Sequence, residues 1–168
     1  MIRAVLFDRD GTLIADGEGS LTLMPGAVTA ISRLRERGIR IAVITNQPRP
    51  GTDLRARRAM HGLHHRIETR IGSVDGWFVC THAPDEGCSC RKPQPGLIFE
   101  AARALGVAPN ECAVIGDIEG DMEAARRAGA QGILVPTPVT RVEEVARARV
   151  VCRDLLEAVE RVLAQAAA

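Results

Sequence analysis

The chain has 168 residues, of which 46% are hydrophobic and 26% charged, and its formal net charge is +1. This composition excludes intrinsic disorder and provides no strong basic field to hold nucleic acid. No apolar run is long enough to cross a bilayer, and the first residues lack the layout of a signal peptide, so we expect a cytoplasmic protein without membrane contact. The length predicts a single domain, residues 1–168.

The hydrophobic pattern predicts strands that alternate with helices. The expected strands are residues 4–7, 39–44, 77–80, 113–115 and 133–135. The expected helices are residues 25–37, a long helix from the N-cap Thr52 to Ile71, and residues 96–105, 121–128, 142–148 and 154–164. This alternation predicts an α/β fold with a mainly parallel sheet, in which polar groups at the carboxyl ends of the strands lie along one edge.

The segment Asp8-Arg9-Asp10-Gly11-Thr12 follows the first predicted strand. Two carboxylates separated by one residue suit a nucleophile and a proton donor. A similar Asp-X-Asp-Gly sequence opens the calcium loops of EF-hands. Here the residues after Gly11 are mostly apolar and the preceding segment is β-like, which excludes a calcium loop.

Polar residues also follow two other strands: Thr45-Asn46 after the second, and Asp117 after the fourth. Taken singly, Thr45-Asn46 fits ordinary turn chemistry, and Asp117 with Asp121 fits a helix N-cap with an acidic first turn. Their joint occurrence at strand ends favours one shared pocket. Lys92 is the only lysine among 22 basic residues, the others being arginine. Either its presence is due to chance, or this position needs the compact charge of an ammonium in place of a planar guanidinium.

A loop after the third strand contains four potential soft metal ligands. They are Cys80, His82, Cys88 and Cys90. Three thiolates and an imidazole form the closed tetrahedral set of a structural zinc site, whereas the alternative is a loop of reduced, unligated cysteines. Because the loop runs directly into Arg91-Lys92, zinc would fix the backbone that aims the lysine.

In this order the motifs resemble those of the haloacid dehalogenase-like phosphotransferases. The matching segments are Asp8 to Thr12, Thr45-Asn46, Arg91-Lys92-Pro93, and Gly116-Asp117 with Asp121. The resemblance covers most of the chain. It implies a three-layer, Rossmann-like fold and a Mg²⁺-dependent phosphatase.

The resemblance also implies a role for each matching residue. Asp8 would attack the phosphoryl group to form an aspartyl-phosphate, and Asp10 would protonate the leaving oxygen and later activate water. The carboxylates of Asp8 and Asp117, with the backbone carbonyl of Asp10, would hold Mg²⁺. The side chains expected to contact the phosphoryl oxygens, or to orient the groups that do, are Lys92, Thr45 and Asp121.

The zinc loop narrows the resemblance to the heptose bisphosphate phosphatases and the related histidinol phosphatases. It implies removal of the 7-phosphate of D-glycero-D-manno-heptose 1,7-bisphosphate, with histidinol phosphate or another small phosphorylated metabolite as the alternative substrate. The expected substrate contacts are Asp16, Gly17, Glu18, Gly19, Asn46, Gln47, Pro48 and Arg91. Arg91 is expected to recognise the sugar or its remaining phosphate, because a forked donor suits a second anion.

The chain departs from these relatives in the loops that are expected to contact the leaving group of the substrate. Residues 45–51 are Thr-Asn-Gln-Pro-Arg-Pro-Gly, whereas the relatives carry Thr-Asn-Gln-Ser-Gly, and Arg49 offers an alternative anion contact. The loop after Thr12 is shorter than theirs and lacks their aromatic residue. Both differences bear on which substrate is bound and leave the chemistry unchanged. A rival function of another class is a non-catalytic, zinc-stabilised module that holds a phosphorylated ligand in the same pocket. We expect a monomer in either case.

Other polar residues have simpler interpretations. His61, His64 and His65 are spaced for one helix, where they predict a mixed polar face and not a metal site. Cys112 and Cys152 adjoin apolar strand residues, which predicts that both are small buried hydrophobic side chains.

Overall fold

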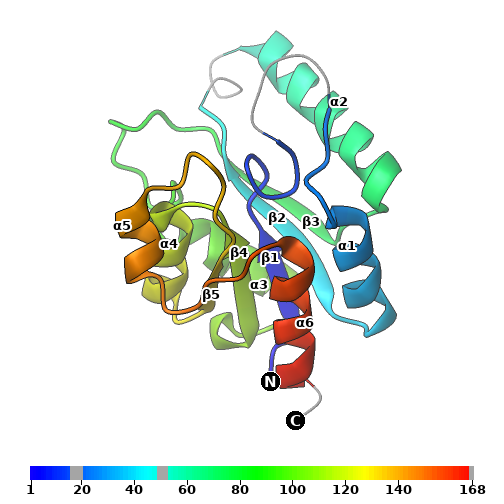
Figure 1. Ribbon diagram of the computed structural model, residues 1–168. Helices are drawn as coiled ribbons and strands as arrows, with labels where there is room; N and C mark the ends of the chain where they lie inside the picture. The colour runs from blue at the N-terminus through cyan, green and yellow to red at the C-terminus, as the bar shows by residue number, and fades with distance from the viewer. Residues whose placement is uncertain (16–20, 49–52, 167–168) are drawn as a thin grey trace.

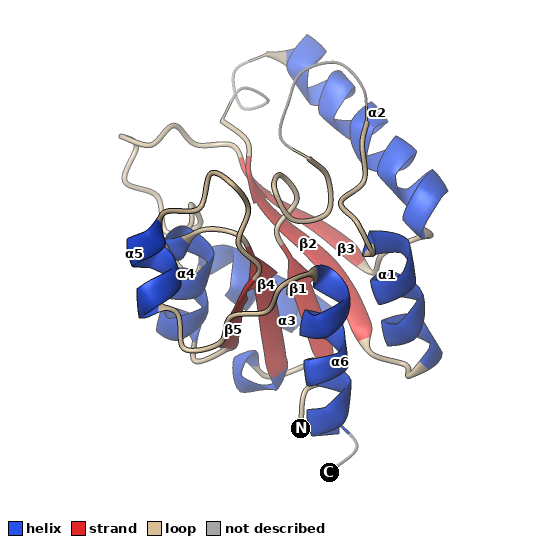
Figure 2. Cartoon of the chain, viewed as in Figure 1, coloured by secondary structure: helices blue, strands red, loops and turns tan. Residues whose placement is uncertain are grey.

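The computed structural model describes residues 1–15, 21–48 and 53–166. A central sheet lies between helices on its two faces (Figures 1 and 2). The strands are β1 (Ala4–Phe7), β2 (Arg40–Asn46), β3 (Gly76–Cys80), β4 (Cys112–Gly116) and β5 (Gln131–Leu134). The helices are α1 (Ala27–Glu36), α2 (Leu54–Ile71), α3 (Gly96–Leu105), α4 (Glu119–Ala128), α5 (Val142–Arg147) and α6 (Leu155–Ala166).

The five strands lie in the order β3-β2-β1-β4-β5, and every neighbouring pair is parallel. The chain fills one side of β1 with β2 and β3, and then crosses to the other side to add β4 and β5. This reversal makes the carboxyl ends of β1 and β4 the topological switch point, where open α/β sheets bind ligands. The predicted parallel α/β fold is confirmed.

Alternate residues of β1 face two separate hydrophobic cores. Val5 and Phe7 pack in the core that α1, α2 and α6 cover, whereas Ala4 and Leu6 pack in the core covered by α3 and α4. All four side chains are fully buried. Because both faces are covered, β1 is a continuous apolar run, the pattern expected of a central parallel strand.

Helix starts differ from the sequence prediction by one or two residues in α1, α2, α4 and α6. The N-cap of α2 is Asp53, whose side chain accepts a hydrogen bond from the backbone of Arg55; Thr52, the predicted cap, lies outside the described residues. Helix α4 begins at Glu119, so Asp121 is its third residue and not its first. There the carboxylate of Asp121 accepts from the backbone N–H of Ile118 at 3.4 Å.

The prediction that His64 belongs to a mixed polar face was wrong. His64, Ile67 and Ile71 are the buried residues of α2, and their spacing of three and four positions puts them on one face. The His64 ring stacks on Trp77 of β3, with the centroids 3.7 Å apart.

Among the helices that the structure describes, none is both long and apolar enough to span a membrane.

Candidate active site

Lys92 lies between two buried carboxylates. Its Nζ is 2.5 Å from Asp8 Oδ1 and 2.6 Å from Asp121 Oδ1. A third bond, of 3.0 Å, goes to the carbonyl oxygen of Ile44 in β2. The three donor positions of the ammonium therefore join groups that follow β1, end β2 and begin α4, and the only lysine of the chain is at the centre of the predicted site.

The carboxylates of Asp8, Asp117 and Asp121 form a buried cluster, with one oxygen of each within 4.8 Å of the others. Two glycines permit this approach. A Cβ at Gly11, whose φ is +76°, would lie 2.3 Å from Asp117 Oδ2, and a Cβ at Gly116 would lie 2.4 Å from the Asp121 carboxylate. The cluster thus depends on the missing side chains of both glycines.

The cluster places three carboxylates around one ammonium. Burial raises the pKa of Asp8 to about 7, with Asp121 adding to the rise and Lys92 opposing it. Burial disfavours the ammonium of Lys92, but its two carboxylate partners outweigh this and raise its pKa. The carboxylates of the cluster supply the oxygen donors that a divalent hard cation such as Mg²⁺ prefers.

Asp10 lies apart from this cluster and is held by other side chains. Arg9 donates from Nε to Asp10 Oδ1 at 3.0 Å and from Nη2 to Oδ2 at 2.8 Å. Gln47 Nε2 donates to Asp10 Oδ2 at 2.6 Å and to Thr45 Oγ1 at 3.0 Å. About a third of the Asp10 side chain is exposed, so it faces the mouth of the site, whereas Thr45 is buried.

Asn46 holds the backbone of Lys92. Its Nδ2 donates to the carbonyl oxygen of Lys92 at 3.0 Å, and its Oδ1 accepts from the Lys92 N–H at 3.1 Å. This reciprocal pair fixes the point from which the lysine side chain extends. Asn46 was predicted as a substrate contact, but in the structure both ends of its amide are engaged with Lys92.

The zinc ligands predicted from the sequence converge in a small tetrahedron. The three Sγ–Sγ distances are 3.3 Å for Cys80–Cys90, 3.6 Å for Cys88–Cys90 and 3.7 Å for Cys80–Cys88. His82 Nδ1 lies 3.2 Å from Cys90 Sγ and 3.6 Å from Cys80 Sγ. Zn–S bonds of about 2.3 Å at tetrahedral angles give edges of about 3.8 Å, so the set fits a structural zinc ion.

The zinc cluster is connected directly to the lysine. The backbone N–H of Arg91 donates to Cys88 Sγ at 3.4 Å, and its guanidinium donates to the carbonyl oxygen of His82 at 3.3 Å. On the other side, the N–H of Gln47 donates to the carbonyl oxygen of Cys80 at 2.7 Å. The loop is therefore tied both to the residue before Lys92 and to the segment that follows β2.

Several predicted substrate contacts cannot be placed. Asp16, Gly17, Glu18, Gly19 and Arg49 lie outside the described residues. Pro48 is described and is partly buried beside Gln47.

Two contacts at the site were not expected from the sequence. One is the pairing of Arg9 with Asp10, for which the signal is a charged residue between two acids. The other is Thr140, whose Oγ1 donates to the backbone carbonyl of Asp117 at 2.7 Å. No local pattern points to Thr140, because it approaches through the loop between β5 and α5.

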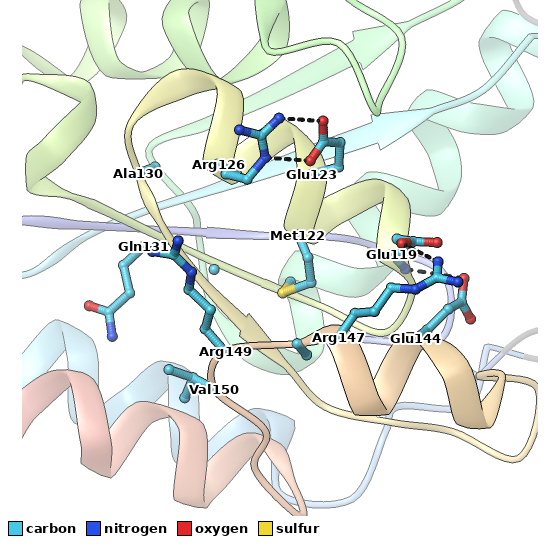
Figure 3. Close-up of a pocket in the computed structure, with 12 residues that line it drawn as sticks. Glu119, Met122, Glu123, Arg126, Ala130, Gln131, Glu144, Arg147, Arg149 and Val150 are labelled. Atoms are coloured by element: carbon cyan, nitrogen blue, oxygen red, sulfur yellow. Dashed lines mark hydrogen bonds and ion pairs between the residues drawn. The ribbon is translucent and has the colours of Figure 1, made fainter.

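A separate hollow of about 400 Å³ lies between α4, the start of β5, and α5 with the segment after it (Figure 3). Its wall is partly apolar, and its rim carries ion pairs of Glu123 with Arg126 and of Glu119 with Arg147. Among the described residues, its lining includes none of the predicted catalytic or metal-binding side chains. The chemistry is therefore concentrated at the carboxyl ends of β1, β2 and β4.

A parallel sheet with buried carboxylates and a lysine at its switch point defines the class: an enzyme of α/β fold equipped for phosphoryl transfer. Residues 15–129 match the family model of haloacid dehalogenase-like hydrolases, and the chain belongs to this family. The match begins after Asp8 and Asp10, so the acidic motif is an observation independent of it.

Curated relatives extend the similarity along nearly the whole chain. The D-glycero-β-D-manno-heptose-1,7-bisphosphate 7-phosphatase of Pseudomonas aeruginosa is 36% identical, over 79% of this chain and 80% of its own. The protein of the same name from Bordetella bronchiseptica is 32% identical, over 98% of this chain and 100% of its own.

A solved structure agrees with these relatives. It is D,D-heptose 1,7-bisphosphate phosphatase from B. bronchiseptica, complexed with magnesium and phosphate. Its TM-score to this chain is 0.80 at 29% identity, with coverage of 98% of this chain and 99% of that one. The predicted superfamily and the heptose phosphatase resemblance are confirmed.

Proposed function

We propose that this chain is a Mg²⁺-dependent phosphatase that removes the 7-phosphate of D-glycero-D-manno-heptose 1,7-bisphosphate. The observation that carries the proposal is the contact of Lys92 with both Asp8 and Asp121 at the switch point of the sheet. This contact brings together the proposed nucleophile Asp8, the ammonium of Lys92 and the carboxylate of Asp121, which come from three separate segments. The relatives with this name support the choice of substrate.

In the first step, Asp8 attacks the phosphorus and the bond to the sugar oxygen breaks. Asp10 gives its proton to that oxygen, which leaves as the sugar hydroxyl. In the second step, Asp10 takes a proton from water, which attacks the phosphorus and releases phosphate from Asp8. Lys92 is already 2.5 Å from Asp8, and can therefore contact a phosphoryl group bound there.

The carboxylates of Asp8 and Asp117, with the backbone carbonyl of Asp10, would hold Mg²⁺. When bound, Mg²⁺ neutralises charge on the phosphoryl oxygens. Asp121 orients Lys92 through the bond of 2.6 Å. Thr45 is proposed to donate to a phosphoryl oxygen, since its hydroxyl proton is available while Gln47 donates to its oxygen.

Substrate recognition outside the phosphoryl site is assigned to the surrounding loops. Arg91 is partly exposed beside Lys92 and is proposed to contact the sugar or the phosphate that remains. The other proposed contacts are Asp16, Gly17, Glu18, Gly19, Asn46, Gln47 and Pro48. We further propose that residues 1–168 form one domain and that the protein is a monomer. We also propose that it acts in the cytoplasm, because a reducing environment suits its five cysteines, none of which forms a disulfide.

The test is a phosphate-release assay with the heptose bisphosphate and Mg²⁺, in which ³¹P NMR identifies the phosphate that remains. Both anomers and histidinol phosphate are parallel substrates. Loss of the 7-phosphate signal with retention of the 1-phosphate is expected. Faster turnover of histidinol phosphate than of the heptose bisphosphate would contradict the proposed substrate. Stoichiometric binding of every substrate without phosphate release would show that the chain is a binding module and not an enzyme.

A further inference from the structure

A buried arginine fixes the orientation of the Asp10 carboxylate. Only 7% of the Arg9 side chain is exposed, and its Nε and Nη2 each bond one oxygen of Asp10 at 3.0 and 2.8 Å. Two parallel N–H···O bonds constrain a carboxylate in its plane as well as in position. The direction in which Asp10 presents its proton therefore depends on where Arg9 is held.

His64 holds the far end of the guanidinium. Its Nε2 lies 3.4 Å from Arg9 Nη1. A guanidinium only donates hydrogen bonds, so Nε2 is the acceptor, and the ring proton is on Nδ1. Burial, with the charge of Arg9 acting in the same direction, lowers the pKa of His64 to about 4. The ring is therefore neutral at neutral pH and able to accept.

Two elements hold the imidazole in place. Its ring is stacked on Trp77 of β3 at an interplanar angle of 10°. Trp77 Nε1 donates to Glu68 Oε1 of α2 at 3.2 Å, and the same oxygen accepts from the backbone N–H of Val74 at 3.1 Å. The histidine thus has a fixed orientation relative to both the sheet and α2.

We propose that His64 is a positioning residue that, through Arg9, aims the Asp10 carboxylate at the leaving oxygen of the substrate. This inference rests on the proposed function, in which Asp10 is the proton donor. In the step concerned, the phosphorus–oxygen bond breaks, its electron pair stays on the sugar oxygen, and the proton of Asp10 moves to that oxygen. A misdirected Asp10 leaves the same oxygen to depart as an alkoxide.

The experiment compares two leaving groups. A sugar alkoxide needs the proton, whereas the p-nitrophenolate of p-nitrophenyl phosphate is a weak base and departs without it. His64→Phe keeps a ring over Trp77 but removes the acceptor. We expect kcat/KM for the heptose bisphosphate to fall about three- to tenfold, the worth of one ordinary hydrogen bond. With p-nitrophenyl phosphate we expect less than about a twofold change in kcat/KM, which covers the steps up to departure of the leaving group and leaves out the later activation of water by Asp10.

Two variants serve as references for His64→Phe. His64→Gln restores an acceptor for Arg9 and should recover most of the lost kcat/KM. His65→Gln makes a matched change at an exposed position of the same helix and should behave as wild type with both substrates.

The outcomes separate this inference from the proposed function. In kcat/KM, Asp10→Asn must discriminate between the leaving groups more strongly than His64→Phe. An inactive wild-type protein, or an Asp10→Asn variant that affects both substrates alike, contradicts the proposed function itself. If those controls behave as expected and His64→Phe slows both substrates equally, or neither, the positioning role is overturned. Should His64→Phe fail to fold, Arg9→Met removes the guanidinium that links His64 to Asp10 and is judged by the same criterion.

Discussion

The ammonium of Lys92 contacts the carboxylate of Asp8 at 2.5 Å although 84 positions separate the two residues in sequence. Both side chains are almost completely buried. An ion pair with little access to water is sensitive to the loss of either partner, because the remaining charge has no solvent to stabilise it. Function and stability are therefore linked at this contact.

Asp8→Asn should abolish turnover and leave the fold intact, because Lys92 keeps the carboxylate of Asp121 as a buried partner. The amide has the shape of the carboxylate but is not a nucleophile, so we expect phosphate release to fall at least about a thousandfold. Asp75→Asn is a matched control at the opposite end of the sheet, where Asp75 accepts from the N–H of Ile41, and its activity should equal that of wild type. Wild-type rates in Asp8→Asn would remove Asp8 as the nucleophile.

Lys92→Met should destabilise the protein as well as inactivate it. It leaves Asp8 and Asp121 buried without their common cation, for which we expect a loss of about 3–5 kcal/mol in the free energy of unfolding. Denaturant titration measures this loss. The double variant Lys92→Met with Asp8→Asn should be more stable than Lys92→Met alone, because it carries one buried charge fewer. A Lys92→Met protein as stable as wild type would contradict the arrangement.

The purified protein should contain one zinc ion per chain. Cys90→Ser removes one of the four ligands, and we expect loss of the metal together with a fall in kcat of at least about tenfold, because the backbone before Lys92 loses its anchor. Elemental analysis measures the zinc. Cys152→Ser, at a buried cysteine outside the cluster, should keep the full amount. Zinc retained in Cys90→Ser would exclude this ligand set.

The stability of the protein should fall on mild acidification because of His64. The pKa of this ring is about 4 in the folded chain, since burial, Arg9 and His61 lower it against the opposing charge of Asp10. In the unfolded chain it is near the ordinary 6.5, so the unfolded state binds more protons between these values. Stability is complete above pH 6.5 and is lost as the pH falls toward 4.

For one group with these two pKa values, the loss between pH 7 and pH 5 is about 2 kcal/mol. Denaturant titrations of wild type and His64→Phe at both pH values measure it. The difference between the two proteins should shrink by that amount at pH 5, because phenylalanine does not titrate. An unchanged difference would show that His64 does not set this pH dependence.

Sequence patterns were sufficient for the fold and for most of the site. The apolar runs predicted the five strands. For the inner strands β1, β2 and β4 the reason is that a central parallel strand is buried on both faces, which requires uninterrupted apolar residues. Helix starts were less well predicted. The cap of α2 is Asp53 and not Thr52, since neighbouring polar residues offer the same local signal and the final choice depends on backbone geometry.

The sequence by itself determined which chemistry is available: acids after a strand, a single lysine, and four soft ligands in one short loop. Only the tertiary structure decided which groups meet. It brought Asp121 to Lys92 and turned Asn46 toward the lysine backbone, and it buried His64 behind Arg9. The physical reason is that ligand type and local spacing are properties of neighbouring residues. These contacts instead arise from the packing of α2, α4, β1 and β2, which no local pattern records.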